Sequence, residues 1–237
     1  MIGIIGGMGP ESGIDLLQKI HQLTKAKQDQ DHLPICLISS PSSIPDRSQF
    51  LLDLSKKNPA IEINKIIELL TTIGVNVIGI PCNSAHAPQI FKELKTPNNV
   101  RIIHMIEELV SNFKNDYPMI DQVGVLCTSG TLKTQIFQAS FALIHVRVVD
   151  VSPEIQEKFI QPAIYKIKSG FHLNSSIPKE HLKKGIQYFI DRDIKTIILG
   201  CTEISLIDFR EDYKEINLIN PTEILAKALV NFYLENK

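Results

Sequence analysis

The sequence predicts an α/β protein with two pseudo-symmetric lobes, each a parallel sheet flanked by helices. Short apolar runs alternate with longer amphipathic stretches along the 237 residues. The apolar runs lack polar alternation, and fully apolar strands are typical of parallel sheets that are buried on both faces. The order of elements in the first half is repeated in the second half. We therefore expect two related lobes that face one another across a cleft.

The first half contains four expected strands, each followed by a helix. The strands are residues 1–6, 34–40, 76–80 and 101–105, and the helices are residues 10–28, 59–73, 87–95 and 106–113. Pro10 suits the first turn of a helix, where its missing N–H would have no partner in any case. Gly74 is typical of the residue that ends a helix. A loop rich in proline and serine, residues 40–50, follows the second strand.

The second half repeats this scheme. Its expected strands are residues 122–128, 145–151, 195–200 and 216–220, and its helices are residues 131–143, 153–170, 178–192 and 221–235. Asn220 and Pro221 suit the N-cap and the first position of the closing helix. Ligands of parallel α/β sheets bind beyond the carboxyl ends of the strands, so function is expected there.

Composition excludes several functional classes. The net charge of −1 and the scattered lysines give no basic surface for a nucleic acid. No segment approaches the ~18 apolar residues of a membrane span, and the apolar start lacks the features of a signal peptide. The four cysteines are far apart without a CxxC pair, so we expect no disulfide framework, no metal site and a cytoplasmic protein.

Two of the cysteines occupy matching positions. Cys82 follows the apolar run NVIGI and Cys201 follows TIILG, and small polar residues come after both. Backbone N–H groups at such strand ends favour a thiolate. If the two sulfurs face each other across a cleft, a thiolate can remove a proton from one face of a carbon and a thiol can deliver one to the other. Cys36 and Cys127, within apolar runs, are expected to be buried packing residues.

Five segments carry a resemblance to a known family. They are GIIGGMGPES at 3–12, IPDR at 44–47, PCNSAH at 81–86, TSGT at 128–131 and GCTE at 200–203. In this order they resemble the aspartate/glutamate racemase family, and within it the aspartate racemases that need no cofactor. The resemblance implies catalysis by Cys82 and Cys201 between two lobes, a small acidic amino-acid substrate, no cofactor and a homodimer. It also implies that residues 1–104 and 211–237 form the lobe with Cys82, and residues 105–210 the lobe with Cys201.

The remaining site residues follow largely from the same resemblance. Asn83, Ser84 and Thr202 are expected to bind the substrate, and Thr128 and Thr131 match the contributing loop of the second lobe. Arg47 and Lys168 are expected to bind the side-chain carboxylate. Met8 is expected to line the pocket beside the glycine-rich turn, and Glu203 to orient Cys201 or the substrate amine.

The start GGMGP and the presence of both cysteines favour aspartate racemisation within the family. Glutamate, or a broader range of amino acids, is the alternative substrate. A further alternative is a protein that binds an amino acid or senses redox state without catalysis, in which the two thiols could form a disulfide. His86, four residues after Cys82, could pair with it at a metal, but tuning of the thiol or capping of a helix is the preferred interpretation.

Overall fold

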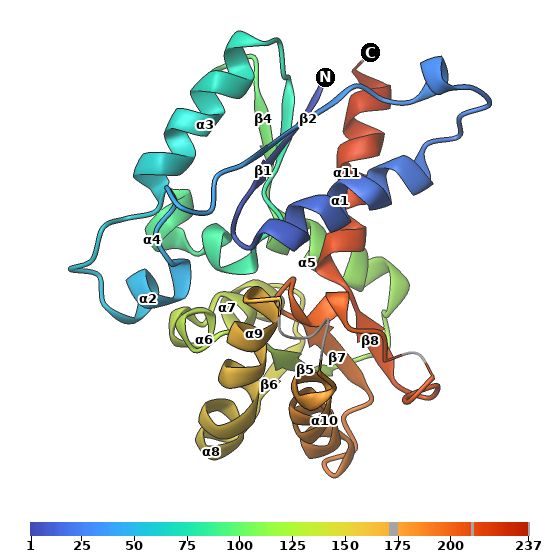
Figure 1. Cartoon of the computed structure of the whole chain (residues 1–237). Coiled ribbons are helices and arrows are strands. Elements are labelled where there is room, and N and C mark those ends of the chain that lie inside the picture. Colours follow the sequence, from blue (N-terminus) through green and yellow to red (C-terminus); the bar gives the residue numbers. More distant parts are fainter. Residues whose placement is uncertain (171–174, 210, 237) are drawn as a thin grey trace.

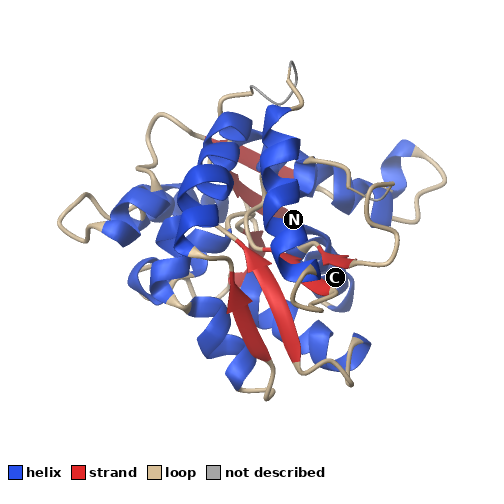
Figure 2. Ribbon diagram, turned by 90° about the horizontal axis from the view of Figure 1, so that it is seen from below, coloured by secondary structure: helices blue, strands red, loops and turns tan. Residues whose placement is uncertain are grey.

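The computed structural model describes residues 1–170, 175–209 and 211–236. These residues form two four-stranded sheets, all of whose neighbouring strands are parallel. Helices flank each sheet, and the two sheets lie one above the other in Figure 1. Figure 2 shows the strands enclosed by helices when the molecule is viewed from below. The predicted fold class, two lobes with a parallel sheet each, is confirmed.

The first lobe is built on the sheet with strand order β2-β1-β3-β4. Its strands are β1 (Ile2–Gly6), β2 (Ile35–Ser39), β3 (Val77–Gly79) and β4 (Arg101–Ile103). Its helices include α1 (Pro10–Leu23), α2 (Arg47–Leu52), α3 (Ala60–Thr72) and α4 (Pro88–Phe91), with a 3₁₀ turn, η1, at Asp29–Asp31. The apolar face of α3 packs on this sheet because its buried residues recur at helical spacing.

The second lobe has the equivalent strand order, β6-β5-β7-β8. Its strands are β5 (Gln122–Leu126), β6 (Arg147–Asp150), β7 (Thr196–Leu199) and β8 (Asn217–Ile219). Its helices are α6 (Ser129–Thr134), α7 (Ile136–Ala142), α8 (Pro153–Ile155), α9 (Gln161–Lys168) and α10 (Ile177–Ile190), with short turns η3 (Gln156–Ile160) and η5 (Ile204–Leu206). The identical order of the two sheets is the source of the pseudo-symmetry.

The strand order fixes where a ligand site belongs in each lobe. In each sheet the second strand is added on one side of the first strand, and the third and fourth strands are added on its other side. The direction of the connections therefore reverses between β1 and β3, and again between β5 and β7. Loops at such a reversal diverge and leave a crevice at the carboxyl end of the sheet. Cys82 lies just beyond β3, and Cys201 just beyond β7. The two cysteines therefore occupy equivalent positions in the two lobes.

Two helices connect the lobes. α5 (Met105–Asp116) and α11 (Pro221–Glu235) pack against each other, and α11 also packs against α1. Leu225 and Leu229 of α11 join a core cluster with Ile2 and Ile4 of β1, whereas Ile106 of α5 joins a cluster of the second lobe. The start of β1 and the end of α11 lie on the same side of the molecule (Figure 1).

The last strand differs from the expected lobe boundary. Residues 211–237 are expected as a whole in the first lobe, but β8 pairs with β7 and extends the second sheet. Only α11, which follows, returns to the first lobe. In the parallel register of β7 and β8, Thr196 aligns with Asn217 and Ile198 aligns with Ile219.

Two expected helices are interrupted. The stretch 131–143 forms α6 and α7, divided at Gln135, whose φ of 52° is left-handed. The stretch 153–170 contains the wide π-helical turn η3 before Pro162. Proline cannot donate an N–H and its ring crowds the carbonyl four residues back, so a local change of helical pitch is the expected response. Within the described residues, no helix combines the length and the apolar content needed to cross a membrane.

Candidate active site

A cavity between the two lobes gathers most of the residues that the sequence singled out. It is narrow, with a volume of about 10 Å³. Its lining residues are Asp46, Arg47, Ser48, Cys82, Asn83, Ser84, Thr128, Lys168, Cys201, Thr202 and Glu203. The first six come from the first lobe and the last five from the second. Both cysteines therefore border one enclosed space.

A larger groove lies elsewhere and contains no cysteine. It has a volume of about 630 Å³ and runs between α1, α11 and residues 205–209. Its lining includes Lys19, Glu223 and Lys227. We place the candidate active site at the smaller cavity because two thiols lie there beside charged side chains, whereas the lining of the larger groove contains no thiol.

Cys82 is held by a short, fully buried loop. It forms the N-cap of the 3₁₀ turn η2 (Asn83–His86), and its N–H donates to the Ile80 carbonyl over 2.8 Å. The His86 ring contacts the same carbonyl, with Nε2 at 3.0 Å, and stacks on Phe91. Burial, aided by His104, lowers the pKa of His86 to about 3. His86 is thus a neutral support of the loop that carries Cys82. Its ring contacts a backbone carbonyl and an aromatic ring, whereas the sequence favoured a role in tuning the thiol or capping a helix.

Arg47 begins α2, where the sequence predicted a loop. Asp46 caps this helix by accepting from the Gln49 N–H over 3.0 Å. Arg47 is 8% exposed, and one terminal nitrogen of its guanidinium donates to the Pro45 carbonyl over 3.1 Å, while its Nε has no partner. Burial opposes its charge, but the adjacent Cys82 sulfur and Asp46 raise the pKa of Arg47. A buried cation with an unused donor suits an anionic ligand.

Cys201 is paired with a carboxylate instead. Its Sγ donates to Oε2 of Glu203 over 2.9 Å. Burial and the negative charge of Glu203 raise the pKa of Cys201 well above its ordinary value. The Cys201 side chain is therefore a thiol when the site is empty. The two cysteines have opposite electrostatic surroundings, with a cation beside Cys82 and an anion beside Cys201.

Glu203 is itself charged and held from three sides. Its Oε1 accepts from Lys168 Nζ over 2.5 Å and from the Gly9 N–H over 2.9 Å. Burial disfavours the carboxylate, but Lys168 and the Cys201 hydrogen bond outweigh it and lower the pKa of Glu203. Lys168, from the end of α9, also donates to the Met8 carbonyl over 3.5 Å.

Three hydroxyl groups bridge the lobes at the other wall of the cavity. Ser84 Oγ lies 2.7 Å from Thr131 Oγ1 and 3.4 Å from Thr128 Oγ1, and the two threonine hydroxyls are 3.0 Å apart. Thr128 also caps α6. Beside them, both the oxygen and the nitrogen of the Asn83 side-chain amide are buried without a partner. Buried polar groups of this kind are normally satisfied, so the amide is available for a ligand.

The segment around Arg47 is fastened to the second lobe. Tyr165 of α9 donates its hydroxyl to Asp46 over 2.9 Å. The Gly130 N–H donates to Ser48 Oγ over 2.9 Å. Lys133 donates to the Leu52 carbonyl over 2.7 Å. These three contacts position Arg47 over the cavity.

Thr202 connects the two cysteine loops. It accepts from Ser12 Oγ over 2.8 Å, and its hydroxyl lies 3.3 Å from both the Pro81 carbonyl and Glu203 Oε2. Pro81 directly precedes Cys82. The buried Thr202 hydroxyl therefore contacts both the backbone next to Cys82 and the carboxylate next to Cys201.

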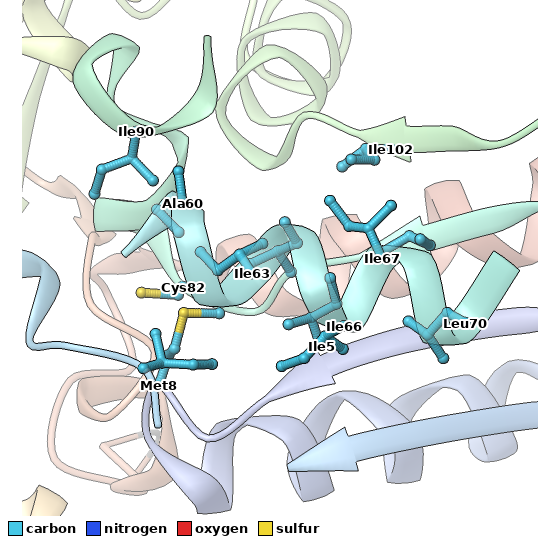
Figure 3. Close-up of a cluster of buried hydrophobic side chains, with 14 of the residues drawn as sticks. Ile5, Met8, Ala60, Ile63, Ile66, Ile67, Leu70, Cys82, Ile90 and Ile102 are labelled. Atoms are coloured by element: carbon cyan, nitrogen blue, oxygen red, sulfur yellow. The ribbon is translucent and has the colours of Figure 1, made fainter. Parts of the chain in front are cut away.

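Most predicted site residues meet in the cavity, but Met8 does not line it. Its side chain is 1% exposed and packs with Cys82, Ala60 and Ile63 in the core of the first lobe (Figure 3). Only its carbonyl faces Lys168. Thr131 is outside the lining and acts through Ser84 and Thr128. Cys127 is buried, and Cys36 packs half-exposed against the first-lobe core.

Sequence reasoning missed Ser12, Asp46, Ser48 and Tyr165. Asp46 carried a signal, because an Asp three residues before a Gln is typical of a helix N-terminus. The other three are ordinary polar residues whose partners are far away in the sequence. Within the described residues, no three or more His, Cys, Asp or Glu side chains gather as a metal site.

Comparison with known proteins identifies the family. The family model for Asp/Glu/hydantoin racemases matches residues 5–229. The broad specificity amino-acid racemase RacX of Bacillus subtilis (strain 168) is 27% identical over 238 residues, which cover 99% of this chain and 98% of the relative. The aspartate racemase of Picrophilus torridus superimposes with a TM-score of 0.84 at 28% identity, over 98% of this chain and 93% of that one.

A glutamate racemase shares the fold at lower identity. The structure of the Francisella tularensis enzyme in complex with D-glutamate superimposes with a TM-score of 0.68 at 21% identity, over 99% of this chain and 81% of that one. Since the family model spans nearly the whole chain, and two lobes with a cysteine at each equivalent strand end form one cavity, this protein belongs to the Asp/Glu/hydantoin racemase family.

Proposed function

We propose that the protein interconverts L- and D-aspartate without a cofactor, using Cys82 and Cys201 as the two acid–base groups. One observation carries the proposal. The two cysteines come from equivalent loops of the two lobes and line the same cavity. A substrate bound between the lobes then has a sulfur available from each side.

The reaction needs only proton transfers. A thiolate takes the α-proton, so that the Cα–H bond breaks and an S–H bond forms. The electron pair left on Cα delocalises into the α-carboxylate. The opposite thiol then gives its proton to the other face of Cα and becomes the thiolate. The product has the opposite configuration, and the two cysteines have exchanged roles.

The surroundings of the cysteines support a defined resting state. Arg47 is the cation beside Cys82, and both line the cavity. Glu203 accepts the hydrogen of Cys201 and keeps that residue a thiol. We propose that Cys201 is the proton donor in the free enzyme, which leaves the role of base to Cys82.

In this proposal, polar groups of the cavity bind the α-amino and α-carboxylate groups of the substrate. These two substrate groups contact the unpaired Asn83 amide, the hydroxyls of Ser84 and Thr128 and, near Cys201, the hydroxyl of Thr202. Thr131 holds Ser84 in position. Arg47 takes the side-chain carboxylate, because its Nε is buried and unpaired.

Substrate choice follows from Arg47 and from the relatives. An acidic side chain needs a cation, and an apolar one would leave Arg47 buried and unsatisfied. Aspartate is preferred because the Picrophilus torridus aspartate racemase has a similar structure over nearly its full length. Glutamate or a broader range is the alternative, supported by the similarity to the broad specificity enzyme of Bacillus subtilis.

The test is an assay of the purified protein, without added cofactor, on both enantiomers of aspartate and glutamate. We expect chiral chromatography to show conversion of both aspartate enantiomers. In heavy water, racemisation should be accompanied by incorporation of deuterium at Cα. Cys82→Ala and Cys201→Ala should each abolish net racemisation, whereas Cys36→Ala, outside the cavity, should retain it. Single active-site variants with full turnover would exclude the two-thiol mechanism.

The same assays address the non-catalytic alternative. All four cysteines are free in the structure. A redox sensor would show no turnover on any amino acid and would form a Cys82–Cys201 disulfide under mild oxidation. The homodimer remains a proposal of its own, to be tested by the solution mass of the purified protein.

A further inference from the structure

Lys168 has a partner that a substrate anchor should lack. Its ammonium lies 2.5 Å from Glu203 Oε1, and the carboxylate is only 3% exposed. The other carboxylate oxygen of Glu203 is 2.9 Å from Cys201 Sγ. A continuous chain of contacts therefore runs from Lys168 through Glu203 to Cys201. The following inference rests on the proposed function, because it assigns a role within the same site.

The contrast with Arg47 is direct. Within the described residues, Arg47 forms no ion pair with a carboxylate, and its Nε has no partner. Lys168 is neutralised at contact distance by Glu203 and is 19% exposed. To bind a second carboxylate, Lys168 would have to share its charge or release a buried anion, and an uncompensated buried anion is costly.

We propose that Lys168 is a positioning residue for Cys201. By pairing with Glu203 it fixes how readily the Cys201 thiol loses its proton, and it leaves the side-chain carboxylate of the substrate to Arg47.

The charged groups around Lys168 and Glu203 determine in which direction each substitution should change the acidity of Cys201. Glu203 faces Lys168 from α9, the Gly9 N–H ahead of α1, and the Cys201 thiol. The further charged or titratable groups that line the cavity are Asp46, Arg47 and Cys82. Burial raises the pKa of Cys201 most, Glu203 raises it further, and Lys168 lowers it. Removal of Lys168 should therefore make Cys201 a weaker acid, and removal of the Glu203 charge should make it a stronger one.

The test measures Cys201 in the free enzyme, without substrate. Alkylation of the full-length protein by iodoacetamide is followed over a pH series, and mass spectrometry separates the Cys201 peptide from the Cys82 peptide. We expect Lys168→Met to move the Cys201 alkylation midpoint to higher pH and to slow alkylation at fixed pH about tenfold, the effect of losing an opposite charge at this range. Glu203→Gln should move the midpoint to lower pH.

Two control variants accompany these. Lys168→Arg keeps the charge and should restore the midpoint to near that of the wild type. Lys166→Met removes a lysine from the same helix outside the cavity and should leave the midpoint unchanged. The Cys82 peptide is measured in the same digest and shows whether the change in alkylation is confined to Cys201.

Steady-state kinetics on aspartate separate positioning from anchoring. We expect Lys168→Met to lower kcat about 10²-fold with little change in KM. The substitution makes Cys201 a weaker acid and leaves the substrate-binding groups in place. A rise in KM at unchanged kcat, with unmoved alkylation midpoints, would make Lys168 a substrate anchor and overturn the proposal.

The two readouts also distinguish this inference from the proposed function. If no amino acid is racemised but the alkylation midpoints move with opposite signs, the proposed function fails and the control of Cys201 by Lys168 stands. If aspartate is racemised but both midpoints stay fixed, the proposed function stands and this inference fails.

Discussion

Ser84 and Thr131 belong to different lobes, and their hydroxyl oxygens lie 2.7 Å apart at the wall of the cavity. Both side chains are buried, so the hydrogen bond holds the lobes together where water is largely excluded. The same pair places Ser84 close to Cys82 in sequence and Thr131 close to the Thr128 cap. The contact therefore links the packing of the two lobes to the geometry of the candidate active site.

Thr131→Val should weaken this coupling. Valine keeps the shape of threonine but removes the hydroxyl, which leaves Ser84 with only its longer contact to Thr128. We expect a loss of about 1–2 kcal/mol in the free energy of unfolding, together with a higher KM for aspartate. Urea denaturation and steady-state kinetics measure the two effects. Thr134→Val, on the same helix, removes a hydroxyl that bonds only within its own lobe and should leave KM unchanged.

Gly130→Ala tests the fastening of α2. A Cβ at this position would lie 2.5 Å from both the Cα and the carbonyl oxygen of Ser48, which is backbone and cannot swing aside. The helix that starts with Arg47 would have to move away from the second lobe. We expect kcat/KM for aspartate to fall about 10²-fold, because misplacement by about 1 Å has effects of this size.

Gly74→Ala is the matched control for this substitution. Gly74 has a φ of 82°, but nothing lies within 4 Å of the added Cβ. It should cost about 1 kcal/mol of stability through backbone strain alone and leave kcat/KM intact. If both variants lost activity equally, a general loss of stability rather than the Ser48 contact would be responsible.

The Lys168–Glu203 pair should also be visible in stability. Glu203→Gln leaves the Lys168 ammonium largely buried without its anion, and we expect a cost of about 3–5 kcal/mol. The double variant Glu203→Gln/Lys168→Met should cost less than the sum of the single variants, because no uncompensated charge remains. A double-mutant cycle by urea denaturation gives the coupling. Additive single effects would contradict a direct interaction.

The pH dependence of this pair has a defined sign. Burial opposes the Glu203 carboxylate, but Lys168 outweighs burial and lowers the pKa of Glu203 below 4.5. The unfolded chain then takes up a proton at higher pH than the folded one. The stabilisation by the pair is therefore fully present above about pH 4.5 and is lost as pH falls through the lower pKa of the folded state. Glu203→Gln should remove this component of the acid transition.

The sequence predicted the features that local patterns encode. Apolar runs that end in Cys82 and Cys201 identify buried strands with polar exits, and a parallel sheet brings such exits to one edge. The lobe expected for the three-residue strand 217–219 is wrong because its composition suits either sheet, and only its pairing with β7 decides between them. The helix break at Gln135 carries no glycine or proline signal.

The candidate site likewise contains residues that a local motif indicates and contacts that only the complete fold creates. Cys82, Asn83 and Ser84 are neighbours in sequence, so one motif indicates all three. The pairing of Lys168 with Glu203 joins residues 35 positions apart, and that of Ser12 with Thr202 joins residues 190 apart. Such contacts depend on how the two lobes meet, which no local pattern specifies. The expectation for Met8 is wrong for the related reason that its backbone faces the cavity while its side chain faces the core.

His86 should make the protein more sensitive to acid. Burial and the neighbouring His104 lower the pKa of His86 from 6.5 to about 3, so the unfolded chain binds a proton over this interval and the folded one does not. Stability should fall as pH drops from 6.5 towards 3, by up to about 5 kcal/mol, at 1.36 kcal/mol for each of roughly 3.5 units. His86→Phe keeps the stacking on Phe91 but cannot take up a proton, so its stability should be less dependent on pH over the same interval. Urea denaturation at a series of pH values measures both slopes, and His145→Phe, an exposed histidine of the second lobe, is the control that should retain the wild-type slope. Parallel slopes for wild type and His86→Phe would show that His86 is already protonated in the folded protein or is not buried in solution.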